Sequence, residues 1–188
     1  MNKHSAALDC YTWAIMDFIM KQSPEIYHFT DDGVIPNSKL PVVIFRGVFS
    51  LDPDTGADWL EGHFAENKWT NAFRWRVYDY HHYHSNTHEV LGVYAGSALL
   101  QLGGEHGQQI KVGLGDVVVL PAGTGHKSIS HSDDFAVVGA YPDGVEPDLI
   151  RLDEDRPEGV REKVDGVSLP ENDPLNGKSE GGLLSFWR

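Results

Sequence analysis

Residues 70–141 divide into short apolar segments separated by turn sequences, and this pattern restricts what the region can fold into. The segments are rich in β-branched and aromatic residues, and the turns, such as "AGS", "GLGD" and "PAGTG", are rich in glycine and polar residues. Short strands at such regular intervals indicate an antiparallel sandwich or barrel, not βαβ units. The expected strands are residues 71–79, 80–84, 89–94, 97–102, 108–112, 116–120, 127–131 and 135–141.

The flanking sequences predict additions to this all-β region. Residues 5–21 have apolar side chains near helical spacing, which indicates an amphipathic helix. The segment "LPVVIFRGVF" predicts one more strand, "DPDTG" a turn, and "ADWLEGHFAENKW" a short helix. The predicted organisation is an N-terminal helical extension at residues 1–38, a β-barrel at 39–142 and an extended arm at 143–188, anchored by "LLSFW".

Composition excludes several classes of partner. The formal net charge of −13 repels nucleic acid and anionic lipid, so neither is expected to bind. One cysteine, Cys10, rules out an internal disulfide and fits a reducing compartment. The early apolar run "CYTWAIMDFIM" contains Asp17 and lacks a preceding basic region, so we expect neither a secretory signal nor a membrane span. These features predict a cytoplasmic protein with a small-molecule or protein partner.

Four of the ten histidines lie in the stretch "YHHYHSNTHEVLG". Side chains alternate along a strand, so His82 and His84 are expected on one face and His81 on the other. Glu89 begins the next strand, and "GDVVVLPAGTGH" ends in a turn that delivers His126. Three imidazoles and a carboxylate suit one divalent Fe, Mn, Ni, Zn, Co or Cu ion, whereas calcium and magnesium prefer oxygen ligands.

The two stretches resemble the paired motifs of the cupin superfamily. The first has His82, one residue, His84, four residues, Glu89, six residues and then a glycine; the second has the spacing of "G-x5-P-x-G-x2-H" and ends at His126. Between residues 40 and 178 the sequence is similar to the YjlB-like group of small bacterial cupins. The resemblance implies an all-β jelly roll (double-stranded β-helix) that holds a metal through these four residues. Two motif positions depart from it: Arg76 replaces a glycine and Ser130 replaces an asparagine.

Other interpretations apply to these and neighbouring residues. The four ligand candidates could form a buried polar network without metal, although three imidazoles around a carboxylate are hard to satisfy that way. His81 and His88 are expected to pack or to form hydrogen bonds, and His88 could orient Glu89. Arg74, Arg76 and Tyr78 share sequence parity with His82, so they could point into the barrel and meet an anionic substrate. A bulge in the strand would reverse this parity. The aromatic run from Trp69 to Tyr80 is expected in the core.

These features predict a metal-dependent enzyme, an oxygenase or an isomerase/epimerase, that acts on a small oxygenated or anionic metabolite. The fold does not choose between such reactions. A non-catalytic metal-assisted sensor or storage protein for a small ligand is the alternative, whereas a seed-storage role does not suit one small barrel with all four ligands. The apolar terminal segments would suit a homodimer.

Overall fold

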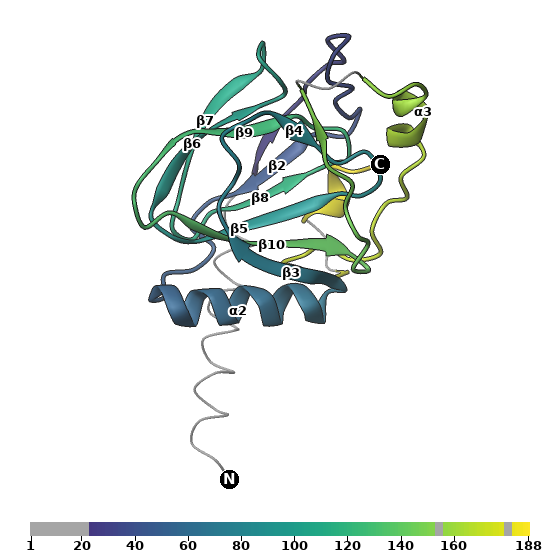
Figure 1. Ribbon diagram of the computed structural model, residues 1–188. Helices are drawn as coiled ribbons and strands as arrows, with labels where there is room; N and C mark the ends of the chain where they lie inside the picture. The colour runs from purple at the N-terminus through teal and green to yellow at the C-terminus, as the bar shows by residue number, and fades with distance from the viewer. Residues whose placement is uncertain (1–22, 153–155, 179–181) are drawn as a thin grey trace.

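The computed structural model describes residues 23–152, 156–178 and 182–188, which form two antiparallel sheets (Figure 1). The six-stranded sheet has the order β1 (Glu25–Tyr27), β2 (Val42–Phe45), β8 (Val117–Leu120), β5 (Glu89–Ala95), β10 (Ala136–Pro142) and β3 (Trp69–Trp75). The five-stranded sheet has the order β11 (Ile150–Arg151), β4 (His82–Tyr83), β9 (His126–His131), β6 (Ser97–Leu102) and β7 (Gln108–Gly113). The all-β jelly roll expected from the sequence is confirmed.

The core between the sheets is built from alternating inward-facing residues. Leu91 and Val118 of the six-stranded sheet are buried in one cluster with Leu100 of the five-stranded sheet. The alternation in these strands therefore fixes which side chains leave the core, and the polar site lies where the apolar cluster ends.

The second face of the six-stranded sheet is covered by helix α2 (Pro53–Glu66), which lies across β3, β5 and β10 (Figure 1). Leu60 of α2 packs so closely over Gly92 that a Cβ there would lie 2.6 Å from the Cδ2 of Leu60. The sequence "DPDTG" was expected to be a turn but begins this helix: Asp52 caps it by accepting a hydrogen bond from the backbone N–H of Thr55, and Pro53 occupies its first turn.

The regions outside the barrel are more structured than the sequence suggested. The expected helix at residues 5–21 lies outside the described residues, but the N-terminal region also supplies β1, an edge strand pairing with β2 that the sequence analysis missed. The C-terminal region contains β11, helix α3 (Val160–Asp165) and the 3₁₀ helix η1 (Leu183–Ser185). Trp187 is buried in the cluster beneath the six-stranded sheet and donates a hydrogen bond to the carbonyl of Pro41 at 2.8 Å.

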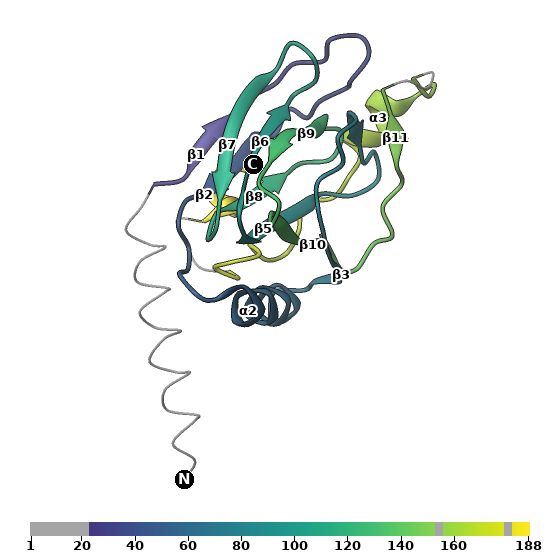
Figure 2. The same ribbon diagram turned by 60° about the vertical axis from the view of Figure 1, so that its left-hand side comes forward.

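Figure 2, turned by 60°, shows α3 and β11 at the edge opposite β1 and β2. Within the described ranges, no helix has the length and apolar character needed to cross a membrane.

Candidate metal centre

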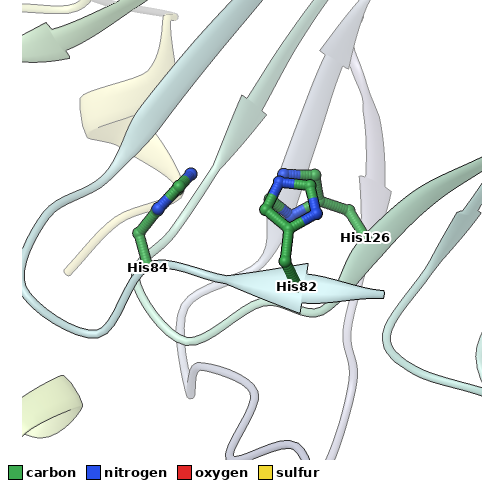
Figure 3. A group of neighbouring side chains, drawn as sticks. All are labelled: His82, His84 and His126. Atoms are coloured by element: carbon green, nitrogen blue, oxygen red, sulfur yellow. The ribbon is translucent and has the colours of Figure 1, made fainter. Parts of the chain in front are cut away.

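Three buried imidazoles converge from neighbouring parts of the five-stranded sheet (Figure 3). His82 on β4 lies directly opposite His126 on β9, with ring centroids 4.1 Å apart. His84 follows the last residue of β4 and its ring lies 5.5 Å from that of His82. Each of the three offers one nitrogen within 4.8 Å of the others, which is close enough for a single ion.

Each imidazole is oriented by a backbone carbonyl on its outer side. Nδ1 of His82 lies 3.3 Å from the backbone carbonyl oxygen of Tyr80. Nδ1 of His84 lies 2.5 Å from the backbone carbonyl oxygen of Asp148. Nδ1 of His126 lies 3.0 Å from the backbone carbonyl oxygen of Thr124. A carbonyl accepts but cannot donate, so in each neutral ring Nδ1 carries the proton and Nε2 carries the lone pair. This tautomer is the one that metal-binding histidines adopt when a carbonyl fixes the second nitrogen.

Glu89, the first residue of β5, brings a carboxylate to the imidazoles from the opposite sheet. Its Oε2 lies 3.5 Å from Nε2 of His84 and 3.3 Å from Nε2 of His126, yet it is buried without a hydrogen-bond partner among the described residues. The other oxygen, Oε1, accepts a hydrogen bond of 3.1 Å from the hydroxyl of Tyr141 on β10. A buried carboxylate oxygen without a donor, next to imidazole nitrogens, fits a cation ligand.

Burial and mutual attraction set the charges of this group. Burial lowers the pKa of His82 to about 2, assisted by the nearby His126, so His82 is neutral. Burial opposes charge on His84 and Glu89 too, but their mutual attraction outweighs it: the pKa of His84 is raised and that of Glu89 lies well below its ordinary value. Without metal, His84 and Glu89 therefore favour an ion pair.

The loop that carries His84 is fastened to the C-terminal arm by Asp148. The carboxylate of Asp148 accepts hydrogen bonds from the backbone N–H of Ser85 at 2.6 Å, from its hydroxyl at 2.5 Å, and from Nζ of Lys163 on α3 at 2.8 Å. Gly123, a motif glycine with a φ of +80°, donates its N–H to the carbonyl of His84 at 2.7 Å. Residues far along the chain thus hold the peptide unit that joins His84 to Ser85.

The imidazoles line one end of a cavity of about 520 Å³, within the range of small-molecule sites. Its apolar lining includes Phe73, Val77 and Leu91, and Tyr141 contributes a phenol beside Glu89. The cavity therefore gives a small molecule access to the polar group.

Comparison with known proteins decides the family. The chain is 42% identical over 169 residues to the uncharacterized protein YjlB of Bacillus subtilis (strain 168), a match that covers 89% of this chain and 99% of YjlB. The chain is a YjlB-like cupin. No family model matches it.

Solved structures similar to this YjlB-like cupin are more distant. Procruciferin, the 11S globulin of Brassica napus, is 21% identical with a TM-score of 0.35; the match covers 45% of this chain and 21% of the globulin. A variant of oxalate decarboxylase from B. subtilis is 19% identical with a TM-score of 0.38; the match covers 71% of this chain and 31% of that enzyme. The YjlB-like chain thus spans less than a third of either protein, and we draw nothing about function from them.

The other histidines of the stretch are placed away from the three imidazoles in this YjlB-like cupin. His81 is buried on the opposite side, with Nε2 3.4 Å from a carboxylate oxygen of Glu105. His88 accepts a hydrogen bond from the N–H of Ala122 at 2.9 Å, while its Nε2 lies 3.2 Å from the carbonyl of Ser168. His88 therefore ties the barrel to the C-terminal region, and among the described residues its ring nitrogens contact Ala122 and Ser168 instead of Glu89.

Arg74, Arg76 and Tyr78 all line the cavity, but the parity reasoning behind them does not hold. Strand β3 ends at Trp75, and every residue from 73 to 78 lines the cavity, so alternation no longer applies. Trp75 and Tyr78 were expected in the core but are 64% and 42% exposed, because this segment forms part of the cavity rim instead of a continuous strand.

Two residues of the site were not found from the sequence. Tyr141 was assigned only to a strand, and Asp148 only to the acidic arm. Both act through contacts across more than 50 positions, Tyr141 with Glu89 and Asp148 with Ser85. The motif spacing carries no signal for either of them.

Proposed function

We propose that this YjlB-like cupin is a metal-dependent enzyme of the oxygenase or isomerase/epimerase type. Its divalent transition metal would be held by His82, His84, Glu89 and His126. The observation that carries the proposal is the buried Oε2 of Glu89, which makes no hydrogen bond among the described residues and lies within 3.5 Å of the Nε2 atoms of two imidazoles. The Nδ1 atoms of all three imidazoles are turned to carbonyls. Such a donor set supports a borderline transition ion.

The chemistry of the four ligands supports an open coordination sphere. Four protein donors leave two positions of an octahedral ion for oxygen atoms of a small molecule, and such an ion polarises carbonyl groups or stabilises developing negative charge. The formal charge of ion plus Glu89 is about +1, which favours an anionic or enolisable ligand. The cavity leads a molecule of this kind to the site.

Tyr141 would assist by holding a proton at the site. Burial raises the pKa of its phenol, and the carboxylate of Glu89 raises it further, so the hydroxyl stays protonated at physiological pH. Its hydrogen bond to Oε1 of Glu89 fixes the direction of the carboxylate. Tyr141 also lines the cavity, so while its proton is donated to Glu89 its oxygen can accept a hydrogen bond from a bound molecule.

The cavity also supports a second function, metal-assisted binding or sensing without turnover. Apart from the four ligand candidates, its described lining contains no carboxylate, lysine or histidine that could act as a general base. This favours either chemistry carried mainly by the ion or no chemistry at all. The predicted homodimer and the predicted cytoplasmic location stay predictions; light scattering on the purified chain measures the first.

Metal analysis of protein purified without chelator tests the proposal. We expect about one transition ion per chain in the wild type, and loss of the ion in Glu89→Ala and His84→Ala. The matched control is His81→Ala, which removes a buried imidazole on the opposite side and should retain metal, with folding of all variants checked by circular dichroism. Full occupancy in His84→Ala contradicts the ligand assignment.

Screens on the loaded protein then separate the functions. Iron with substrate-dependent oxygen uptake supports an oxygenase. Manganese, nickel or zinc with turnover but no oxygen uptake supports an isomerase or epimerase. Ligands that bind to the loaded protein without any turnover support the sensing function.

A further inference from the structure

The cavity changes in polarity from its buried end to its rim. The buried end holds His82, His84, Glu89 and His126, whose side chains carry the nitrogen and oxygen donors. At the rim, Trp75 is 64% exposed, Leu149 43% and Tyr78 42%. A ligand that fills the cavity therefore meets polar donors at one end and exposed apolar surface at the other.

The exposed surface is largely flat and aromatic. Tyr78 stacks on Tyr80 with ring centroids 4.8 Å apart and an angle of 15° between the rings. Tyr78 also presents its ring to His82 at 5.2 Å in an edge-on arrangement, which links the rim to the candidate ligands. Aromatic rings in such an array favour contact with another flat ring, by stacking or by edge-to-face packing.

The arginines at the rim offer little to a multiply charged ligand. The guanidinium of Arg74 is paired with two carboxylates of α2, Asp58 at 2.6 Å and Glu61 at 2.7 Å. Arg76 donates to the carbonyl of Asp133 at 2.7 Å, and no carboxylate in the described part of the chain pairs with its charge. Of the two, only Arg76 has charge to offer, so the rim suits at most one carboxylate and disfavours a sugar phosphate.

We infer that the ligand of this cavity is an aryl compound whose ring carries a two-oxygen head group, such as an aryl hydroxy acid or keto acid. The inference rests on the proposed function, because the oxygen atoms are assigned to the metal at the buried end. The ring then lies against Trp75, Tyr78 and Leu149 and removes their apolar surface from water. An open-chain sugar would leave that surface wet and is the disfavoured substrate.

The test compares two probes with the same head group. Mandelate and lactate are both α-hydroxy acids; mandelate carries a phenyl ring where lactate carries a methyl group. Binding to the metal-loaded full chain is measured by titration calorimetry, with metal content checked for every sample. We expect mandelate to bind about tenfold tighter or more, because the ring covers additional apolar surface. Trp75→Ala and Leu149→Ser should each narrow the ratio of the two affinities without lowering metal content.

The outcomes separate this inference from the proposed function. Equal affinity for both probes overturns the aryl ligand but leaves the metal-dependent function standing. Failure of both probes to bind the loaded protein overturns the two together. An aqueous quencher of tryptophan fluorescence, applied before ligand is added, measures whether Trp75 is exposed, and Trp75→Phe identifies its share of the signal. If the quencher does not reach Trp75, a second chain covers the rim, and this also overturns the inference.

Discussion

The backbone oxygen of Asp148 lies 2.5 Å from Nδ1 of His84, although the two residues are 64 positions apart. The same residue anchors Ser85 through its carboxylate. The direction of one candidate ligand therefore depends on a residue outside both motifs. Orientation of this kind is worth about 10–100-fold in metal affinity at other sites.

Removal of the Asp148 carboxylate should weaken metal binding without removing a ligand. Asp148→Ala frees Ser85 and Lys163, so the backbone that orients His84 loses its anchor, and we expect the dissociation constant for Zn²⁺ to rise about 10-fold. Asp148→Asn retains an accepting oxygen and should recover part of the affinity. Glu158→Ala, an exposed acidic change on the same arm, is the control, and competition with a chromophoric chelator is the measurement. Equal affinities in all four proteins would contradict the anchoring role.

Metal binding should release a proton from His84. The pKa of His84 is raised above about 6.5 because attraction to Glu89 outweighs burial, so at pH 6.5 more than half of the metal-free molecules carry that proton. Titration calorimetry in buffers of different ionisation enthalpy counts the protons released. Glu89→Gln removes the attraction, and the release at pH 6.5 should fall. Unchanged release in this variant would assign the proton to another group.

The metal-free protein should lose stability as the pH falls from about 6.5 towards 4. Burial lowers the pKa of His88 to about 4, whereas in the unfolded chain it is about 6.5. Within this window the unfolded state takes up the proton and the native state does not, so the free energy of unfolding falls by up to about 1.4 kcal/mol per pH unit for this residue. His81, with a pKa lowered to about 4 mainly by burial, adds a similar dependence.

Urea unfolding at several pH values, with chelator present, measures this dependence. His88→Gln should reduce the pH dependence of the free energy of unfolding between pH 6 and 5 by about 1.4 kcal/mol per pH unit. It should also lower the free energy of unfolding at neutral pH by about 1–3 kcal/mol, because the hydrogen bonds of His88 are lost. A wild-type slope in His88→Gln would show that His88 titrates normally in the native state.

The close approach of α2 to the sheet gives a prediction about packing. A Cβ at position 92 would lie 2.6 Å from the Cδ2 of Leu60, so Gly92→Ala should destabilise the fold by about 1–3 kcal/mol. Leu60→Ala alone should cost about 2–5 kcal/mol. The double variant should be less destabilised than the sum, because the smaller side chain makes room for the added methyl. Thermal unfolding of the four proteins gives the coupling, and simple additivity would mean that the two residues do not interfere.

The sequence predicted what depends on local spacing. His82, His84, Glu89 and His126 are brought together because strand alternation and two short turns determine where each side chain points. The metal that they would bind remains a prediction. Most barrel strands were located for the same reason, since polar turns separate apolar segments.

The misplaced residues are those where alternation or local pattern gives no information. Trp75 was expected in the core but is exposed at the cavity rim, because strand β3 ends there and alternation gives no information about the residues that follow. Asp52 and Pro53 form a helix start that resembles a turn, because both structures favour the same residues. The role of Asp148 depends on a contact with Ser85 that only the tertiary fold creates.

Trp187 packs against the outer face of the six-stranded sheet, with the barrel strands made long before it. While the chain is being synthesised, α2 can already pack on that face, but the part that Trp187 contacts stays exposed until residue 187 has left the ribosome. The nascent barrel therefore exposes an apolar surface during translation, and a chaperone that shields this surface would raise the yield of folded protein.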